Sequence, residues 1–583
     1  MLNNYKNMYI LFRLCAFKPS PKSFHFSTFY SPPTTYYTRY SIPNCQYLSL
    51  LLPSRRYSTT MEVVAAVLKR SSVAGNSIAI KENGCSYSYA QLASLVGKIS
   101  QSLRIKATDE GANESVGPRI GIVAKPSIDF VASVLATWIC GGVAVPLAVS
   151  YPESELLHVM NDAEISHVLS TEDYQEVMSK ISQKCGAEFS LISCVPSKVE
   201  NGNLQLENFD VTHKERPALI MYTSGTTGKP KGVVHTHKGI NAQVEILAKA
   251  WEYSSNDHFL NCLPLHHVHG FFNALLAPLF SGSTIEFMEK FSVRGIWQRW
   301  RDCNPENGIS SDTISVFTGV QTMYTRLIQG YEAMDTDAQK ASASAARRLR
   351  LMMCGSSALP ISVMQRWEEI TGHRLLERYG MTEFVMALSN PLRGYRKGGT
   401  VGHPFPSIQV RITEEDNDSE SKGVGVLCVK SPSMFKEYWK LPQVTEQSFT
   451  SDGFFITGDA CRIDEDGYFV ILGRTSADIM KVGGYKLSAL EIESVLLQHD
   501  AVSECCVLGL PEKDYGEAVC AIVVLDVEFK IKHEIINLQE LRDWSKDKLA
   551  PYKIPTRLFL WDSLPRNAMG KVNKHELKKL ILA

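Results

Sequence analysis

The sequence lacks any Cys-x-x-Cys pair, although it contains 14 cysteines among 583 residues. The cysteines are scattered, and the only close pair, Cys505 and Cys506, is directly adjacent. A zinc site or a disulfide framework needs cysteines at suitable, recurring spacings. We therefore expect neither, and we expect the reduced thiols of a mitochondrial matrix or cytosolic enzyme.

Residues 1–60 lack acidic side chains altogether. They contain seven Lys or Arg and many Ser, Thr, Tyr and Pro, a composition typical of an organelle transit peptide rather than of a packed core. We expect a disordered segment that directs the chain to the mitochondrial matrix, with cleavage near Tyr57. Met61 would then be a second start that gives a cytosolic form. A disordered tail with a chance charge bias is the alternative. The ending "KKLILA" is no peroxisomal Ser-Lys-Leu signal.

The chain also lacks an excess of positive charge and an uninterrupted apolar span. Beyond residue 60, 54 basic residues face 61 acidic ones, which gives no general reason to bind nucleic acid. Residues 130–149 are twenty residues without a charge, but Gly141, Gly142 and Pro146 interrupt them. We expect a buried helix followed by a strand there, not a membrane span. For the oligomeric state, the sequence is compatible with both a monomer and a dimer.

A chain of 583 residues exceeds what one hydrophobic core usually organises, so we expect at least two domains. Up to about residue 470, helical patterns alternate with short β-branched runs, which predicts layered α/β structure. After Gly473 the units are smaller and predict an α+β domain of about 110 residues. The predicted organisation is a transit peptide over 1–60, a large N-terminal domain over 61–474 and a small C-terminal domain over 475–583.

The stretch "YTSGTTGKPKG", residues 222–232, gathers glycines, hydroxyls and lysines behind an apolar run. Glycine tolerates positive φ, so such a loop can turn its N–H groups around an anion, and polyphosphate is the natural ligand. A P-loop needs four residues between its glycines and a Ser or Thr after its lysine. Here only two residues separate Gly225 from Gly228, and Pro230 follows Lys229. A plain hairpin turn would not need so many polar donors.

This loop resembles the signature of the adenylate-forming superfamily, which includes acyl-CoA synthetases, firefly-type luciferases and adenylation domains of peptide synthetases. The resemblance spans roughly residues 61–580 and implies a large multi-sheet domain with a small mobile one. It also implies that the loop holds the β- and γ-phosphates of ATP and that Mg²⁺ is bound by Thr226 and Glu383. The loop residues implied are Thr223, Ser224, Gly225, Thr226, Thr227, Gly228 and Lys229.

Further motifs match the nucleotide site of the same superfamily. "CGSSALP", ending at Pro360, matches the segment beside adenine, and "ERYGMTE" places Tyr379 at adenine, Thr382 at the α-phosphate and Glu383 at Mg²⁺. A hard divalent ion prefers carboxylate and phosphate oxygens. The remaining nucleotide residues that the resemblance implies are Gly355, Ser356, Ser357, Glu377, Arg378, Gly380, Met381, Asp459 and Arg474.

The motifs near the C-terminus match the catalytic and coenzyme A segments of the superfamily. Asp459 would accept the ribose hydroxyls, and Arg474 would close that side. Lys571 in "LPRNAMGK" matches the catalytic lysine, which stabilises charge during transfer; with Thr382 and Glu383 it completes the implied catalytic set. The CoA segment would comprise Gly483, Gly484, Tyr485 and Lys486. The small domain would rotate about a hinge at Ala477 or Asp478.

The acyl site is expected around "HHVHG", where the resemblance places His269 and Gly270, together with Ser356. A zinc site is disfavoured because no further ligands accompany the histidines at suitable spacing. Arg326 in "TGVQTMYTRLI" would pair with the second carboxylate of a short diacid if it points inward. Pointing outward, it would be a solvated helix charge. We favour the inward orientation.

Within the superfamily the sequence most closely resembles malonyl-CoA synthetases, in particular those of plants. The resemblance implies conversion of malonate, ATP and CoA to malonyl-CoA, AMP and pyrophosphate. A CoA ligase for another short-chain, methylmalonic or aromatic acid is the alternative. A catalytically inactive nucleotide-binding protein is disfavoured because the motif residues are retained. A peptide-synthetase module is disfavoured because the sequence ends at Ala583 without a carrier domain.

Overall fold

The computed structural model of the chain describes most of the protein beyond residue 60. The described residues are 61–103, 117–148, 150–192, 215–223, 230–303, 312–413, 423–483, 485–513, 515–531, 535–566 and 571–582. The predictions for residues 1–60, for loop residues 224–229 and for Gly484 lie outside them.

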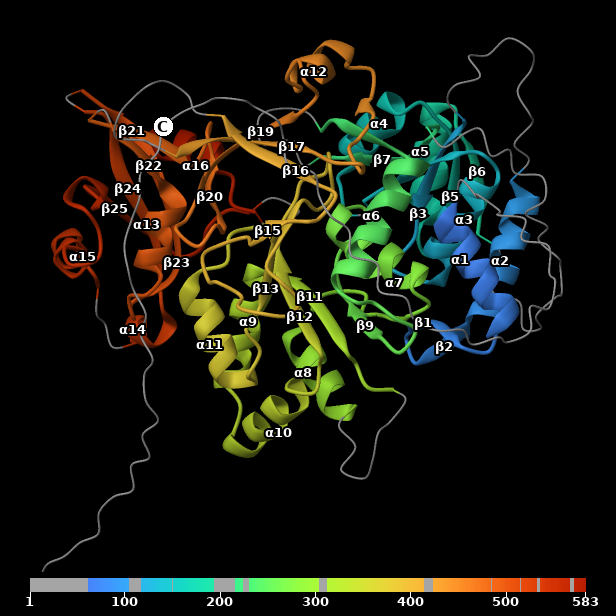
Figure 1. The fold of residues 1–583 in the computed structure, drawn as a ribbon, viewed down its shortest axis with the longest axis horizontal. Helices are drawn as coiled ribbons and strands as arrows, with labels where there is room; N and C mark the ends of the chain where they lie inside the picture. The colour runs from blue at the N-terminus through green and yellow to red at the C-terminus, as the bar shows by residue number, and fades with distance from the viewer. Residues whose placement is uncertain are drawn as a thin grey trace, which may run out of the picture. The chain divides into compact units, whose positions relative to one another are not determined.

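A nine-stranded sheet forms one layer of the long N-terminal part, in the order β15-β14-β13-β12-β11-β9-β10-β1-β2 (Figure 1). The strands from β13 to β1 are parallel. The bounds are β1 Ile78–Glu82, β2 Cys85–Ser88, β9 His258–Asn261, β10 Thr284–Phe287, β11 Val316–Val320, β12 Leu351–Gly355, β13 Leu376–Tyr379, β14 Leu388–Ser389 and β15 His403–Pro404. Ligands of open α/β sheets bind at the carboxyl ends of the strands, and three predicted site segments follow β11, β12 and β13.

A seven-stranded sheet forms the second layer, in the order β18-β8-β7-β4-β3-β5-β6. Its strands are β3 Arg119–Val123, β4 Val143–Pro146, β5 Ile165–Ser170, β6 Glu188–Leu191, β7 Pro217–Tyr222, β8 Gly232–Thr236 and β18 Glu437–Tyr438. β7 and β8 are antiparallel neighbours, with Tyr222 opposite Gly232. Residues 223–231, which contain the glycine-rich loop, therefore connect the two strands of a hairpin.

Helices pack between and around the two large sheets. They are α1 Glu62–Val73, α2 Tyr89–Ser102, α3 Ile128–Ile139, α4 Glu153–Asp162, α5 Gln175–Cys185, α6 His237–Ala250, α7 Ala277–Phe280, α8 Val293–Asp302, α9 Gln321–Glu332, α10 Thr336–Ala346, α11 Ile361–Thr371, α12 Pro442–Gln447 and a π-helix, His269–Leu276. The main core joins both sheets, because Leu219 of β7, Phe259 of β9, Val244 of α6 and Phe271 of the π-helix belong to one buried cluster.

A second core supports the β11–β12 end of the nine-stranded sheet, where α8, α9, α10 and α11 lie in Figure 1. Its centre is aromatic, with Trp297, Trp300, Phe317, Tyr324 and Trp367 all buried. Rings of this size bury large apolar areas and fix their neighbours through edge-to-face contacts. This packing holds the start of α9 and the turn after β12 on a rigid support.

The smaller C-terminal part is an α+β unit, as predicted. A four-stranded antiparallel sheet precedes it: β16 Gln409–Thr413, β17 Val424–Lys430, β19 Phe455–Ile463 and β20 Phe469–Arg474. The C-terminal sheet has the order β22-β21-β24-β23, and β25 pairs with β24. Its elements are β21 Ile479–Val482, β22 Tyr485–Ser488, α13 Ala489–Leu496, β23 Val502–Glu512, β24 Gly516–Leu525, α14 Val527–Ile531, α15 Leu538–Ser545, β25 Arg557–Trp561 and α16 Lys574–Leu582.

The described part of the uncharged stretch, residues 130–148, contains a helix and a strand, as expected. Ser127 caps α3 by accepting a hydrogen bond from the Phe130 N–H, and β4 follows as a fully buried central strand. In the described part of the chain, no helix is both long and apolar enough to cross a bilayer.

Candidate active site

The base of the glycine-rich loop is closed by Thr223 and Lys231. The Thr223 N–H donates to the Lys231 carbonyl at 3.0 Å, and the Lys231 N–H donates to Thr223 Oγ1 at 3.3 Å. The Lys231 ammonium lies 5.2 Å from the ring centroid of Tyr438, and the Tyr438 hydroxyl donates to Glu383 Oε1 at 2.7 Å. The loop base and the predicted metal ligand are therefore close neighbours. Sequence reasoning did not assign Lys231 or Tyr438 to the site.

Glu383 is a buried carboxylate at the turn after β13. Burial raises its pKa, and the hydrogen bond from Tyr438 opposes that rise. Burial makes the Glu383 carboxylate costly to ionise, and a cation bound beside it would offset that cost. Its hard oxygen donors therefore fit Mg²⁺, whereas the second implied ligand, Thr226, lies outside the described residues.

Asp459, Arg474 and Tyr379 form a corner suited to ribose. Asp459 of β19 lies opposite Arg474 of β20 in the sheet register, and Arg474 Nε lies 2.9 Å from Asp459 Oδ1. The Tyr379 hydroxyl donates to the other oxygen, Oδ2. Burial raises the pKa of Asp459, while Arg474 and Tyr379 oppose the rise. A carboxylate has about four acceptor sites, so these contacts still leave room for ribose hydroxyls.

Lys571 lies beside this ribose corner. Burial lowers the pKa of its ammonium, the Arg474 charge lowers it further, and the Asp459 charge opposes both. The side chain nevertheless retains solvent-exposed surface, so its desolvation is incomplete. Lys571 also contributes to lowering the pKa of His267. Its ammonium therefore lies within electrostatic range of both the ribose corner and His267.

The turn after β12 is held in an unusual conformation. Ser356 has φ of 68°, in the left-handed region that is uncommon for residues other than glycine. Its hydroxyl lies 3.1 Å from His269 Nδ1, and Ser357 is exposed. Pro360 occupies the N-cap position of α11, directly before its first helical residue, Ile361.

Glu377 supports the 355–360 turn rather than facing solvent. Its Oε1 accepts the Leu359 N–H at 3.0 Å, and its Oε2 has no hydrogen-bond partner among the described residues. Burial raises the pKa of Glu377 to about 8. A Cβ on the nearby Gly380 would lie 1.7 Å from the Val385 carbonyl oxygen, so only glycine fits there.

Stability should therefore depend on the charge of Glu377. Because its pKa rises from 4.5 unfolded to about 8 folded, the folded state loses stability relative to the unfolded state as pH rises through this range. We expect Glu377→Gln to raise the melting temperature relative to wild type at pH 8 and to make little difference at pH 4.5, because glutamine can still accept the Leu359 N–H. Calorimetry at both pH values tests this, with exposed Glu446→Gln as the control. An equal difference at both pH values would contradict it.

His269 is the first residue of the π-helix. Its side chain is buried, and both ring nitrogens contact polar side chains. Its Nε2 lies 2.7 Å from Thr318 Oγ1, and Arg378 donates to the same nitrogen. Burial, followed by the Arg378 charge, lowers the pKa of His269 well below its ordinary value. His269 is therefore neutral near pH 7. π-Helical turns frequently mark functional sites.

Arg378, which the resemblance assigns to the nucleotide site, contacts the predicted acyl residue His269 in this structure. Its guanidinium, 2% exposed, contacts Thr318 at 3.1 Å, and Asn273 accepts from it at 3.2 Å in the amide orientation that satisfies both groups. No carboxylate among the described residues lies within ion-pair distance of it. A cation buried in this way would favour an anionic ligand nearby. Thr318 and Asn273 were not predicted as site residues.

The inward orientation favoured for Arg326 is wrong in this structure. Arg326 is exposed, and its guanidinium carbon lies 5.5 Å from the ring centroid of Phe291. The buried face of α9 is formed by Met323, Tyr324, Leu327 and Ile328, and position 326 falls on the opposite face. α9 still begins directly after β11, whose Thr318 contacts His269.

The predicted CoA segment lies on the β21–β22 hairpin. Tyr485 is 42% exposed and stacks on Tyr552, with ring centroids 4.4 Å apart. Gly483, with φ of 57°, adopts the left-handed conformation that glycine tolerates, and Lys486 is exposed beside them.

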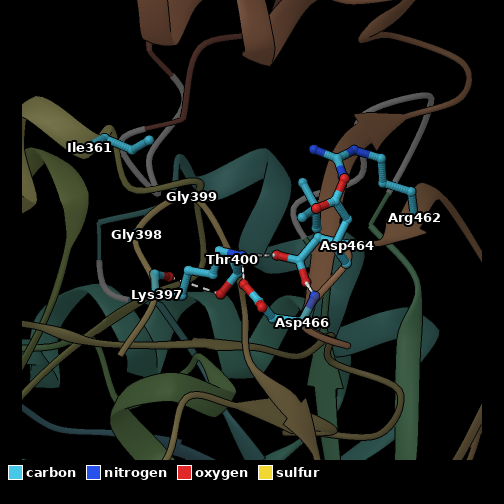
Figure 2. A pocket seen from close by; sticks show the side chains of 10 residues that line it. Ile361, Lys397, Gly398, Gly399, Thr400, Arg462, Asp464 and Asp466 are labelled. Atoms are coloured by element: carbon cyan, nitrogen blue, oxygen red, sulfur yellow. Dashed lines mark hydrogen bonds and ion pairs between the residues drawn. The ribbon is translucent and has the colours of Figure 1, made fainter. Parts of the chain in front are cut away.

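A cavity of about 360 Å³ lies beside the β19–β20 hairpin and is lined by Lys397, Gly399, Arg462 and Asp464 (Figure 2). Lys397 Nζ lies 2.8 Å from Asp464 Oδ2 and also pairs with Asp466. None of the predicted site residues lines this cavity. Because its lysine is already neutralised by two acids, it does not resemble a phosphate site.

One group of potential metal ligands lies elsewhere, at His258, Glu286 and Asp312. Arg299 Nη2 lies 3.4 Å from Asp312 and the same guanidinium pairs with Glu286, while Lys81 also pairs with Asp312. These cations neutralise both carboxylates, so we regard the group as an ion-pair network.

The Asp459–Arg474 corner and His267, both within electrostatic range of Lys571, are the arrangement expected of an adenylate-forming enzyme. The chain belongs to the AMP-binding enzyme family: the family profile matches residues 68–439, and the profile of the AMP-binding enzyme C-terminal domain matches residues 491–571. The predicted superfamily and its arrangement of a large and a small domain are thereby confirmed.

Two relatives and one solved structure are similar over most of their length. A malonate–CoA ligase from Arabidopsis thaliana is 61% identical over 547 residues, covering 90% of each chain. A mitochondrial malonate–CoA ligase from Homo sapiens is 38% identical, covering 88% of this chain and 91% of its own. The crystal structure of ATP-bound MatB from Rhodopseudomonas palustris superimposes with a TM-score of 0.77 at 31% identity, covering 89% of this chain and 98% of that one.

Proposed function

We propose that the protein is an ATP-dependent malonate–CoA ligase, which converts malonate, ATP and CoA to malonyl-CoA, AMP and pyrophosphate. One observation supports the general reaction: Lys571 lies within electrostatic range of the corner in which Asp459 contacts Arg474 and Tyr379 and of His267 at the acyl site. A cation at that junction suits transfer of AMP to an acid. The choice of malonate is supported by the similar enzymes of that name.

In the first step a malonate carboxylate oxygen attacks the α-phosphorus of ATP, and the bond to the leaving pyrophosphate breaks. Residues 223–229 hold the β- and γ-phosphates, Thr382 donates to the α-phosphate, and Lys571 stabilises the charge that develops. Mg²⁺, held by Glu383 and Thr226, would reduce repulsion between the two anionic substrates when it is bound. Positioning and charge neutralisation supply most of the rate enhancement.

In the second step the CoA sulfur attacks the carbonyl carbon of malonyl-AMP, the thiol proton is lost, and AMP leaves. The small domain turns about a hinge at Ala477 or Asp478, so that Gly483, Gly484, Tyr485 and Lys486 replace Lys571 at the site. Exposure of the Tyr485 pair leaves this face available for the incoming thiol substrate.

The acyl site offers malonate two kinds of contact. Ser356, His269 and Gly270 border the reacting carboxylate; a Cβ on Gly270 would lie 2.3 Å from the Pro264 carbonyl oxygen, so the chain there approaches closely. Because Arg326 is exposed on α9, Arg378, which contacts His269 and Thr318, is the proposed partner of the second carboxylate. The buried charge of Arg378 favours a dianion at the same place.

A panel of acids tests the assignment. We expect pyrophosphate release with malonate to exceed that with acetate or a long-chain fatty acid by at least about 10-fold in kcat/KM, because a carboxylate paired with arginine contributes roughly 1.5–3 kcal/mol. Methylmalonate and an aromatic acid belong in the same series. A clear preference for acetate or a fatty acid would contradict malonate while leaving AMP transfer intact.

We also propose that residues 1–60 direct the chain to the mitochondrial matrix and that a start at Met61 gives a cytosolic form. The acid-free, hydroxyl-rich composition supports the first part. A fluorescent reporter fused to residues 1–60 should colocalise with mitochondria, and a diffuse cytosolic signal would count against it.

A further inference from the structure

Lys574, the first residue of α16, connects two carboxylates from different elements of the C-terminal unit. Its Nζ lies 2.7 Å from Asp478 Oδ1 and 2.7 Å from Glu493 Oε1. The three side chains are 13%, 14% and 14% exposed, respectively. Burial alone would lower the pKa of Lys574, but the charges of Glu493 and Asp478 raise it well above its ordinary value. We call this group the Lys574 triad.

Asp478 joins the Lys574 triad to the ribose corner. Its Oδ2 accepts the Arg474 N–H at 2.9 Å, and its own N–H donates to the Arg474 carbonyl at 2.8 Å. The Arg474 guanidinium in turn holds Asp459. A Cβ on Gly473 would lie 2.4 Å from Asp478 Cβ, so the chain is tightly folded here. Asp478, one of the two hinge candidates, is thus hydrogen-bonded to the Arg474 backbone and ion-paired with Lys574.

Glu493 anchors the other end of the Lys574 triad in the core of the C-terminal unit. Its Oε1 also accepts the Val507 N–H of β23 at 2.7 Å, and the neighbouring Ile492 and Leu496 of α13 are fully buried. Removing the Lys574 ammonium would leave two buried carboxylates facing one another without a counter-ion, which is strongly unfavourable.

Only Val572 and Asn573 separate Lys574 from Lys571. Three residue steps span at most roughly 10 Å, so fixing Lys574 restricts where Lys571 can lie. We infer that Lys574 is a positioning residue for the adenylation step: by binding Asp478 and Glu493, it holds the segment that carries Lys571 in place relative to Arg474. This inference rests on the proposed function of Lys571.

Separate assays of the two half-reactions distinguish a positioning role of Lys574 from a general loss of stability. Adenylation needs Lys571, whereas thioester formation uses the β21–β22 face of the same unit. We expect Lys574→Met to slow malonate-dependent pyrophosphate release in a single turnover by at least about 10-fold, because small misplacements of a catalytic group can cost on the order of 10²-fold. Conversion of synthetic malonyl-AMP and CoA to malonyl-CoA should stay within about twofold of wild type, because it does not need Lys571.

Two further variants and a control complete the experiment on the full chain. Lys574→Arg keeps the charge and should restore adenylation to near the wild-type rate. Glu493→Gln breaks an ion pair of the Lys574 triad with little change in shape and can still accept the Val507 N–H; it should slow adenylation selectively, which keeps the test decisive if Lys574→Met does not fold. Lys579→Met, at an exposed lysine of the same helix, should behave as wild type.

Equal losses in both half-reactions for Lys574→Met and Glu493→Gln would overturn the inference, because the triad would then only stabilise the unit. Unchanged adenylation in both variants would overturn it as well. Failure of the wild-type protein to release pyrophosphate with malonate would instead refute the proposed function.

Discussion

Lys571→Ala should release pyrophosphate from ATP and malonate at least about 10²-fold more slowly than wild type, because loss of one preorganised charge-stabilising group typically costs that much. ATP should still bind with nearly unchanged affinity, since the loop, Asp459 and Arg474 remain. Stopped-flow measurement of pyrophosphate release, together with equilibrium ATP binding, gives both quantities.

The position of Lys571 is what makes this effect large. Its ammonium acts on the ribose corner and on His267 together, so no other described lysine substitutes for it there. Lys579→Ala, in the exposed part of α16, should leave both quantities unchanged. Wild-type turnover in Lys571→Ala would show that the catalytic lysine has been misplaced.

Arg378→Lys should lower kcat/KM for malonate by roughly 10- to 100-fold, because lysine lacks the guanidinium fork that can pair with a second carboxylate, and a hydrogen bond to a charged group contributes about 1.5–3 kcal/mol. Acids with a single carboxylate should lose much less, because they have no second anion for the guanidinium. The matched control is Arg366→Lys, an exposed arginine of α11 with surface ion pairs, which should leave the acid preference unchanged.

Steady-state kinetics with malonate and acetate in parallel measure the specificity ratio directly. If Arg378→Lys lowers kcat/KM for both acids equally, the buried Arg378 guanidinium does not bind the second carboxylate.

The fold could be predicted because the sequence patterns that indicate its helices and strands are local. Breakers at Gly141, Gly142 and Pro146 separated α3 from β4, and the change of pattern after Gly473 marked the smaller unit. The family also followed from sequence, because the loop and "ERYGMTE" are long, specific motifs. The roles of the individual motif residues in binding and catalysis stay predictions.

Side-chain direction was less predictable because it depends on packing between distant segments. The buried cation expected at Arg326 is found at Arg378, where Thr318 and Asn273 from two other elements enclose the guanidinium. A motif places Arg378 one residue from Tyr379, yet alternation along β13 sends the two side chains to opposite faces. Contacts such as Tyr438 with Glu383 join residues 55 positions apart, and no local pattern indicates them.

An enzyme that transfers AMP to an acid cleaves ATP at its α-phosphate. Phosphorus NMR of the purified protein with Mg²⁺, ATP, malonate and CoA tests this reaction most directly. We expect AMP and pyrophosphate in equal amounts, each matched by malonyl-CoA. Formation of ADP and inorganic phosphate, or of no nucleotide product with malonate or any other acid, would contradict AMP transfer.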